Sequence, residues 1–204
     1  MKTIIINASP KSKNSNTENF LKHLISRLPE KETKVYKLNE LKTEEIQNCS
    51  SLVFAFPLYV DSLPSELLKF LCLLEKVKFE NKDIMIFAVV NNGFFEGEQN
   101  HIALDIIKNW CNKVGLKWGQ GIGIGAGEMS PAVANIPLKK SPFALLDSAF
   151  DGLACNIENH ISAENIYISP KMPRFLWKIG GTYTFWPQKA KKNGLKARDI
   201  FHQS

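Results

Sequence analysis

The sequence has no closely spaced pair of cysteines. Its four cysteines, Cys49, Cys72, Cys111 and Cys155, are scattered over 204 residues. Structural metal sites, iron–sulfur clusters and small disulfide-rich folds need cysteines that are close together or regularly spaced, so none of these is expected. An isolated thiol more often behaves as a small apolar side chain. We therefore expect all four cysteines to be buried.

Long hydrophobic runs are absent as well. No apolar segment reaches the about 20 residues that a membrane-spanning helix needs, and Met1-Lys2 leads directly into a short predicted strand with no leader pattern. We therefore expect a cytoplasmic protein. The length, together with an apolar content of 44%, predicts one globular domain with some chain to spare at one end.

Two glycine-based phosphate motifs are also missing. The chain lacks G-x-x-x-x-G-K-[ST], and it has no G-x-G-x-x-G that follows a strand and opens a helix. The glycines of residues 116–127 (LKWGQGIGIGAG) lie within or at the end of a predicted strand, with no helix pattern directly after it. We therefore do not assign them to a dinucleotide. Any phosphate would have to be bound by hydroxyl and amide groups, which favours a single terminal phosphate over a pyrophosphate.

Strand and helix patterns alternate along residues 1–161. Short apolar runs predict buried strands, and apolar residues at helical spacing predict amphipathic helices between them. Such alternation is typical of a parallel sheet covered by helices. The predicted class is α/β, a doubly wound five-stranded parallel sheet with helices on both faces. The strands are expected at 3–8, 33–38, 51–56, 83–90 and 116–127, and the main helices from Phe20, from Pro64, over 99–114 and over 143–161.

The last part of the chain differs in composition. We predict a domain over 1–168 and an extension over 169–204, because residues 171–204 hold eight Lys or Arg and one acid, Asp199, without a clean apolar period. Two interpretations stay open for this extension. It is either a solvated tail, or a weak contact with an anionic membrane surface or partner. Nucleic-acid binding is not expected, since no recognition motif accompanies the charge. The apolar residues behind the second interpretation are Phe175, Leu176, Trp177 and Trp186.

The loop after the first strand, residues 9–17 (SPKSKNSNT), carries the first functional signal. Ser15 and Glu18 fit a capping box, which places a helix start inside the loop. The N–H groups of the first helical turn have no intrahelical partner, and the helix dipole adds positive charge there. A phosphate is well accommodated at such a position. An ordinary capped turn explains this loop, taken alone, equally well.

Two further loops follow buried strands, at residues 57–63 (PLYVDSL) and 91–97 (NNGFFEG). In a doubly wound sheet the carboxyl ends of the strands meet at one edge, where ligands bind. Apolar and aromatic side chains beside fixed amide groups suit a flat heteroaromatic ring.

Taken together, the three loops resemble a known group of proteins. SP-x(5)-NT, PLY-x(4)-P and NNGF-x-E are similar, in order and spacing, to the flavin loops of the flavodoxin-like superfamily, within it the NAD(P)H-dependent FMN reductase and quinone reductase group. The resemblance covers about residues 1–165. The phrase QKAKKNGL in the tail also looks like the C-terminal ends of bacterial members.

The resemblance implies an FMN-dependent oxidoreductase that takes a hydride from NADPH or NADH and passes it to a small acceptor such as a quinone, free flavin or azo compound. It implies a homodimer and no catalytic side chain, because the chemistry belongs to the flavin. The implied phosphate contacts are Ser9, Lys11, Ser15, Asn16 and Thr17. The implied ring and ribityl contacts are Pro57, Leu58, Tyr59, Val60, Asn91, Asn92, Gly93 and Phe94.

The chain departs from the pattern in places, and other functions stay open. A compact cysteine motif, present in relatives with an iron–sulfur cluster, is missing. Asp61 stands where a bare acid against the ring is not expected, and it points either to solvent or to substrate. His101 is either a proton donor or an exposed histidine at a helix start. A flavin-binding electron carrier is the main alternative, although carriers of this fold are typically strongly acidic and this chain has a net charge of +6. A flavin-free scaffold or regulator is the third possibility.

Overall fold

The computed structural model describes residues 2–11, 13–41, 43–196 and 198–199. It divides the chain into two compact units, Met1–Pro170 and Lys171–Ser204. That the first unit is an FMN-binding domain stays a prediction.

The first unit is built on one parallel sheet with the strand order β2-β1-β3-β4-β5-β6. The α/β doubly wound class is therefore confirmed, but the expected five strands are one too few. The missing strand is β6, whose three residues pair with Ile122–Ile124. Three residues are too few to show a periodicity. The strands are β1 (Thr3–Asn7), β2 (Thr33–Lys37), β3 (Ser51–Pro57), β4 (Met85–Asn91), β5 (Lys117–Ile124) and β6 (Ile166–Ile168).

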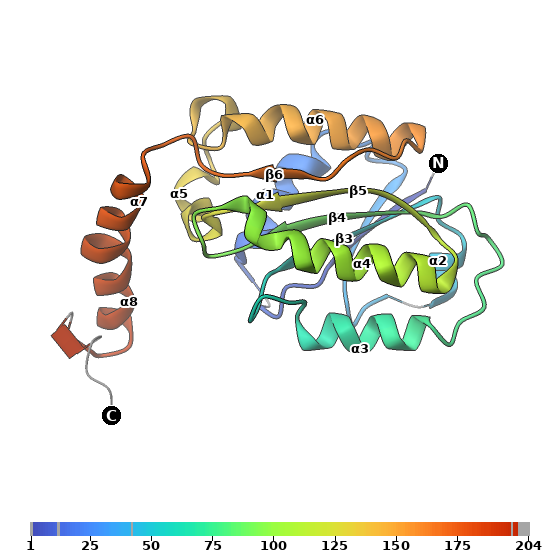
Figure 1. Cartoon of the computed structure of the whole chain (residues 1–204), viewed down its shortest axis with the longest axis horizontal. Helices are drawn as coiled ribbons and strands as arrows, with labels where there is room; N and C mark the ends of the chain where they lie inside the picture. Colours follow the sequence, from blue (N-terminus) through green and yellow to red (C-terminus); the bar gives the residue numbers. More distant parts are fainter. Residues whose placement is uncertain (1, 12, 42, 197, 200–204) are drawn as a thin grey trace. The chain divides into compact units, whose positions relative to one another are not determined.

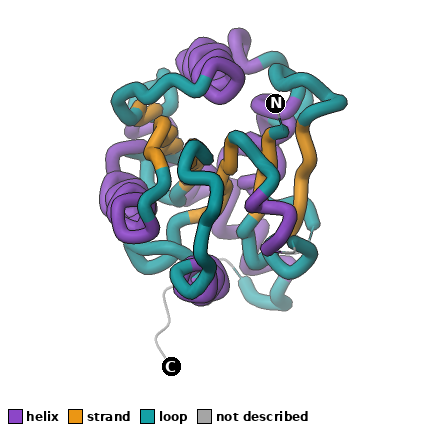
Figure 2. Tube along the Cα trace, turned by 90° about the vertical axis from the view of Figure 1, so that its right-hand side faces the viewer, coloured by secondary structure: helices purple, strands orange, loops and turns teal. Residues whose placement is uncertain are grey.

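Helices cover both faces of this sheet (Figures 1 and 2). On one face lie α1 (Asn16–Ile25) and α6 (Ala144–Asn159), and on the other α3 (Ser65–Leu74) and α4 (His101–Val114), while α2 (Thr43–Gln47) and α5 (Ser130–Val133) are short. The ring of Phe20 meets that of Phe143 edge to face, with centroids 5.5 Å apart, between α1 and the start of α6. Phe54 of β3 meets Trp110 of α4 in the same way at 5.9 Å. Both faces are therefore closed by aromatic packing.

Local signals set the helix ends that matter for the site. The Ser15 hydroxyl oxygen accepts a hydrogen bond from the N–H of Glu18 at 3.0 Å, so the predicted N-cap of α1 is confirmed. Gly115 ends α4 in the left-handed conformation, at φ 71°, as glycine commonly does after a helix.

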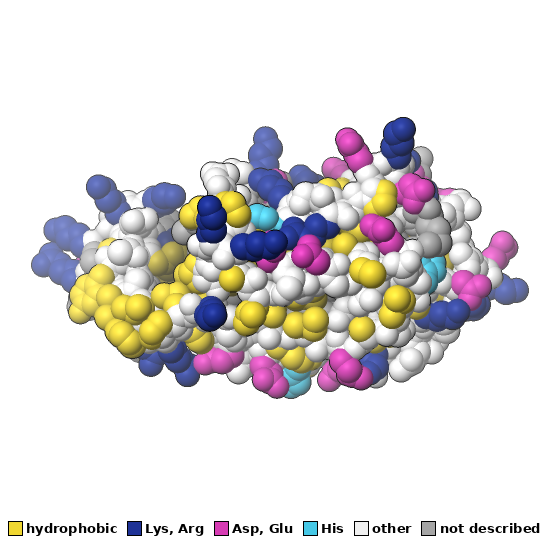
Figure 3. All heavy atoms as spheres, turned by 90° about the horizontal axis from the view of Figure 1, so that it is seen from above, with side chains coloured by type: hydrophobic (Ala, Val, Ile, Leu, Met, Phe, Trp, Pro, Cys, Tyr) yellow, Lys and Arg dark blue, Asp and Glu magenta, His cyan; other side chains and the backbone are white. Residues whose placement is uncertain are grey.

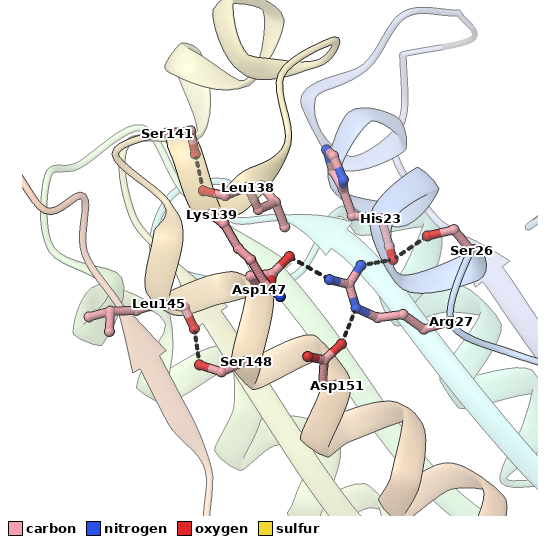
Figure 4. Close-up of polar contacts among 10 residues, drawn as sticks. All are labelled: His23, Ser26, Arg27, Leu138, Lys139, Ser141, Leu145, Asp147, Ser148 and Asp151. Atoms are coloured by element: carbon pink, nitrogen blue, oxygen red, sulfur yellow. Dashed lines mark hydrogen bonds and ion pairs between the residues drawn. The ribbon is translucent and has the colours of Figure 1, made fainter.

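Arg27, just after α1, ties that helix to α6 (Figure 4). Its guanidinium donates to a carboxylate oxygen of Asp147 and to one of Asp151, each at 2.6 Å, and also to the carbonyl oxygen of His23 at 2.6 Å. Lys139 adds a longer contact of 3.5 Å to Asp147. Arg27 and Asp147 are largely buried, so this cluster is a specific link between two helices on the same face. Burial, followed by the charge of Arg27, lowers the pKa of His23.

The glycines of β5 and the loop after it are explained by close packing. A Cβ on Gly123 would lie 2.8 Å from the ring of Tyr167, and one on Gly125 would lie 2.2 Å from the carbonyl oxygen of Phe95. Any side chain there would push β5 away from β6 or from the loop after β4. The spacing G-x-G-x-G therefore serves the contacts of β5 with its neighbours.

Two of the four cysteines contradict the prediction that all are buried. Cys49 and Cys111 are buried, whereas Cys72 on α3 and Cys155 on α6 are exposed. Composition predicts the average behaviour of a thiol. Its position around a helix decides whether the side chain meets the sheet or the solvent.

The second unit is helical, although its sequence shows no clean period. It contains α7 (Arg174–Gly180), a π-helical segment over Gly181–Phe185 and α8 (Trp186–Lys192). A π-turn holds more residues than an α-turn, and this shift hides the 3.6-residue spacing of the apolar side chains. No helix among the described residues is long and apolar enough to cross a bilayer. The expected cytoplasmic location stays a prediction.

Candidate functional site

Four loops meet at the carboxyl edge of the first unit's sheet. Three are the expected loops, residues 9–17, 57–63 and 91–97, which follow β1, β3 and β4. The fourth, residues 125–130, follows β5, which pairs with β4 from Lys117 to Ile124 with one register shift. Because these four strands are parallel neighbours, their loops lie side by side, as in the ligand-binding edge of doubly wound sheets.

Asn91 joins the first three loops. Its side-chain oxygen accepts a hydrogen bond from the hydroxyl of Thr17 at 2.7 Å, and its backbone oxygen accepts one from the N–H of Leu58 at 2.8 Å. Pro57 pairs with the same residue in the sheet. Asn91 is only 3% exposed, so its amide is part of the framework that holds the loops together.

The fourth loop is held by Asn92 and Ser130. The N–H of Gly127 donates to the backbone oxygen of Asn92 at 2.7 Å, and the buried hydroxyl of Ser130 donates to the side-chain oxygen of Asn16 at 3.0 Å. Asn19 in turn donates to Ser130 at 3.3 Å. Ser130 was not among the residues predicted for the site from the sequence. The available signal was that this loop, like the other three, follows a buried strand.

The first loop brings cationic and hydroxyl groups to the N-terminus of α1. The Lys11 ammonium donates to the backbone oxygen of Asn14 at 2.9 Å, and the N–H of Ser9 donates to the Asn7 side-chain oxygen at 3.1 Å. Ser15 accepts a hydrogen bond as the N-cap and can still donate its own hydroxyl hydrogen. Thr17 has already donated its only hydroxyl hydrogen to Asn91, so it can offer an anion only its backbone N–H. Ser12 lies outside the described residues.

The second loop folds into a tight turn. Tyr59 and Ser62 exchange backbone hydrogen bonds at 3.0 Å each way, and between them Val60 and Asp61 have φ of 48° and 55°. Positive φ at both central positions is the pattern of a type I′ turn. Val60 is 98% exposed. A β-branched residue in this region is a genuine conformational outlier.

The third loop keeps its amide side chains inside and presents its next two residues to solvent. Asn92 is buried and donates from its side chain to the backbone oxygen of Glu96 at 3.1 Å. Its side-chain oxygen is shielded from solvent without a hydrogen-bond partner in the structure. Gly93 and Phe94 are exposed, and a Cβ on Gly93 would meet no atom within 4 Å. The open part of this loop is therefore its backbone at Gly93 and the Phe94 ring.

Unfavourable backbone conformations concentrate at this edge. Five non-glycine residues among the described ones have positive φ. Four of them lie in the site loops: Asn14, Val60, Asp61 and Ala126. Such conformations persist where the surrounding structure holds them, and they cluster at ligand sites. His101 lies nearby but is exposed, and its ring nitrogen Nδ1 is 2.9 Å from the backbone oxygen of Glu98, a local contact at the start of α4.

The fold has known counterparts, although the sequence has none at the family level. No family model and no curated protein matches the sequence. An NADPH-quinone reductase from P. pentosaceus is similar in structure, with a TM-score of 0.57 at 20% identity over 77% of this chain and 99% of the other. A Fusobacterium nucleatum flavodoxin bound to flavin mononucleotide has a TM-score of 0.55 at 16% identity, over 79% and 100%. An FMN-dependent NADH-azoreductase from Bacillus anthracis, in complex with FMN, has a TM-score of 0.52 at 14% identity, over 76% and 100%. The chain therefore has the flavodoxin-like fold.

Proposed function

We propose that the first unit binds FMN at the four-loop edge and works as an FMN-dependent NAD(P)H oxidoreductase. The observation that carries the proposal is the set of loops joined through Asn91 and Asn92, in the same place where the fold offers a ligand site. Three of the similar structures are, by name, an NADPH-quinone reductase, an NADH-azoreductase and a flavodoxin, which supports the flavin and the redox chemistry.

The residues present fit such a cofactor in their chemistry. The N-terminus of α1, with the Ser15 hydroxyl and the Lys11 ammonium in the same loop, suits the terminal phosphate. Tyr59 and Phe94 are each about half exposed and would lie against the ring. The backbone at Gly93 would bond the polar edge of the ring, and the unpaired Asn92 oxygen offers one acceptor. Contacts from Asn16, Pro57, Leu58 and Val60 remain part of the proposal.

Bound FMN would supply hydride transfer from NADPH or NADH to a small acceptor, a quinone, free flavin or azo compound. The protein's own part is positional. The loops would hold the ring, and the exposed side chains of Tyr59 and Phe94 would exclude water from one side of it. The backbone N–H of Gly93 would stabilise negative charge at the ring edge.

The first experiment is a titration of the purified chain with FMN and with riboflavin, followed by flavin fluorescence. FMN should bind more tightly, because riboflavin lacks the phosphate. Lys11→Ala should lower FMN affinity by about three- to tenfold, the range of one exposed charge contact, and leave riboflavin affinity unchanged. Lys31→Ala is the matched control, since Lys31 is an exposed lysine in the loop between α1 and β2, at the opposite edge of the sheet. No FMN binding, or equal loss of both ligands in Lys11→Ala, would contradict the site.

The second experiment adds NADPH or NADH to the FMN complex without oxygen. Rapid bleaching of the flavin absorbance supports the reductase. Binding without bleaching supports the alternative, an electron carrier without its own small substrate, which the similarity to a flavodoxin favours. The net charge of +6 speaks against that alternative. A chain that binds no flavin would be left with the scaffold or regulator function.

We also propose that the working form is a homodimer whose second subunit covers the open side of the ring. The half-exposed Tyr59 and Phe94 at the site edge support this, since a flavin that rests against them on one side would keep its other face open. Sedimentation velocity at several protein concentrations tests the dimer. A fully active monomer at every concentration would refute it.

A further inference from the structure

The helical part of the second unit carries a row of exposed apolar side chains. Phe175, Ile179, Tyr183 and Trp186 follow one another at spacings of four, four and three residues and are 59%, 49%, 74% and 54% exposed. Phe175 and Ile179, four residues apart in α7, lie on one side of that helix. The wider turn of the π-helical segment keeps Tyr183 on the same side, and Trp186 adjoins it at the start of α8. The neighbouring Leu176 is also exposed, at 44%. This row, which we call the tail face, is the feature of the second unit that the proposed redox function does not explain.

Cations surround the tail face. Figure 3 shows hydrophobic side chains of this unit gathered together, with Lys and Arg around them. The Lys189 ammonium lies 5.2 Å from the centroid of the Phe185 ring, and this ring packs edge to face with that of Trp186. The single acid of residues 171–204 is Asp199, which follows the helices. The basic residues are Lys171, Arg174, Lys178, Lys189, Lys191, Lys192, Lys196 and Arg198.

We propose that the segment Arg174–Lys192 lies in the plane of an anionic lipid surface, with the tail face between the headgroups and the flanking lysines against lipid phosphates and carboxylates. An amphipathic helix with aromatic residues on one side and Lys and Arg on the other binds membranes in this way. Trp and Tyr suit the interface in particular, because each has an apolar body and one polar group.

The charge of this segment favours an anionic lipid surface over a second copy of the chain as the partner of the tail face. Two tail faces packed against each other would bring eight cations from each copy together with one acid from each. Like charges at that density repel. An anionic bilayer is complementary to both properties of the face, since it accepts apolar side chains and attracts each nearby Lys or Arg.

The test is co-sedimentation of the full chain with two kinds of vesicle, phosphatidylcholine alone and phosphatidylcholine containing phosphatidylserine. Binding should need phosphatidylserine and should fall as salt rises. Replacing Lys178, Lys189 and Lys192 together by Gln should weaken partitioning by about a hundredfold, because each basic residue near such a surface contributes about fivefold.

Apolar variants test the face itself. Ile179→Ser with Trp186→Ser should abolish binding even with the lysines intact. The matched control is Leu68→Ser with Leu73→Ser, which removes two exposed apolar side chains from α3 of the first unit and should leave binding unchanged. Flavin fluorescence and circular dichroism of every variant show whether the first unit stays folded.

Three results would overturn the proposal. The first is that the full chain does not bind vesicles that contain phosphatidylserine. The second is that the control variant and the tail-face variants bind these vesicles equally well. The third is that the chain does not bind vesicles but forms a concentration-dependent dimer, which the tail-face variants lose. The last outcome would assign the tail face to self-association.

Discussion

The hydrogen bond between Thr17 and Asn91 permits a sharp test of how the site loops are held. Both residues are nearly inaccessible, at 1% and 3% exposed, and the bond is 2.7 Å long. Thr17→Val keeps the shape of the side chain but removes the donor, so the side-chain oxygen of Asn91 is left buried without this partner. An unpaired buried acceptor costs about 1–3 kcal/mol.

Thr33 is a matched control for the same substitution. Its hydroxyl oxygen at the start of β2 is shielded from solvent and has no hydrogen-bond partner in the structure. Thr33→Val therefore removes a polar group that already carries its desolvation cost. Its effect on the free energy of unfolding should be between zero and a gain of about 1 kcal/mol.

Urea unfolding followed by circular dichroism measures both variants. With a slope of about 2 kcal/mol/M, a loss of about 2 kcal/mol in Thr17→Val lowers the midpoint by about 1 M, while Thr33→Val should not lower it. If the site binds FMN, the affinity of Thr17→Val should fall as well, because loops 9–17 and 91–97 lose their direct link. Equal free energies of unfolding for the two variants, within an error of about 0.5 kcal/mol, would refute the view that Asn91 depends on Thr17.

Three further predictions concern strain, an ion pair and the thiols. Val60→Gly should raise the free energy of unfolding by about 1 kcal/mol. The backbone strain of a β-branched residue at φ 48° is larger than the entropy that glycine adds to the unfolded chain. Thermal unfolding measures this change, and a destabilised variant would contradict the assigned strain. Arg27→Met should lower the free energy of unfolding by about 2 kcal/mol, because it removes the main partner of the buried Asp147 carboxylate. Lys69→Met breaks an ion pair whose side chains are each more than 60% exposed, so it should change that free energy by no more than about 0.5 kcal/mol. Equal effects of the two variants in urea unfolding would show that the Arg27 cluster adds nothing specific. Burial raises the pKa of the Cys49 and Cys111 thiols to about 12. In native protein at pH 8 these two should therefore be alkylated slowly, while the exposed Cys72 and Cys155 should be alkylated rapidly. Mass spectrometry that finds all four cysteines modified at one rate would refute the buried placement.

Local chemistry made much of the fold predictable. Short apolar runs predicted β1, β3, β4 and β5, and the pattern around Ser15 predicted the N-cap of α1 that the structure confirms. Burial on both faces of a strand and capping at a helix start depend on residues that are close in sequence. The same property made the three expected loops recognisable by their residues and their order.

Other features depend on residues that are far apart in sequence. The edge strand β6 has only three residues and exists because β5 offers it a partner. The helices of the second unit were not predicted, because the π-helical segment between them shifts the spacing of the apolar residues. The cysteines show the same limit, since the packing around α3 and α6 leaves Cys72 and Cys155 in solvent.

The sequence by itself determined the alternation of strands and helices, the helix N-terminus in the first loop and the basic character of the tail. The tertiary structure decided how the loops work together. It turned Asn91 inward to join Thr17 and Leu58, and it brought Ser130 of a fourth loop to Asn16. Those partners are separated by between 33 and 114 residues. Because a hydrogen bond requires its atoms to lie within about 3 Å, no local pattern could predict which side chains face a ligand and which hold the loops.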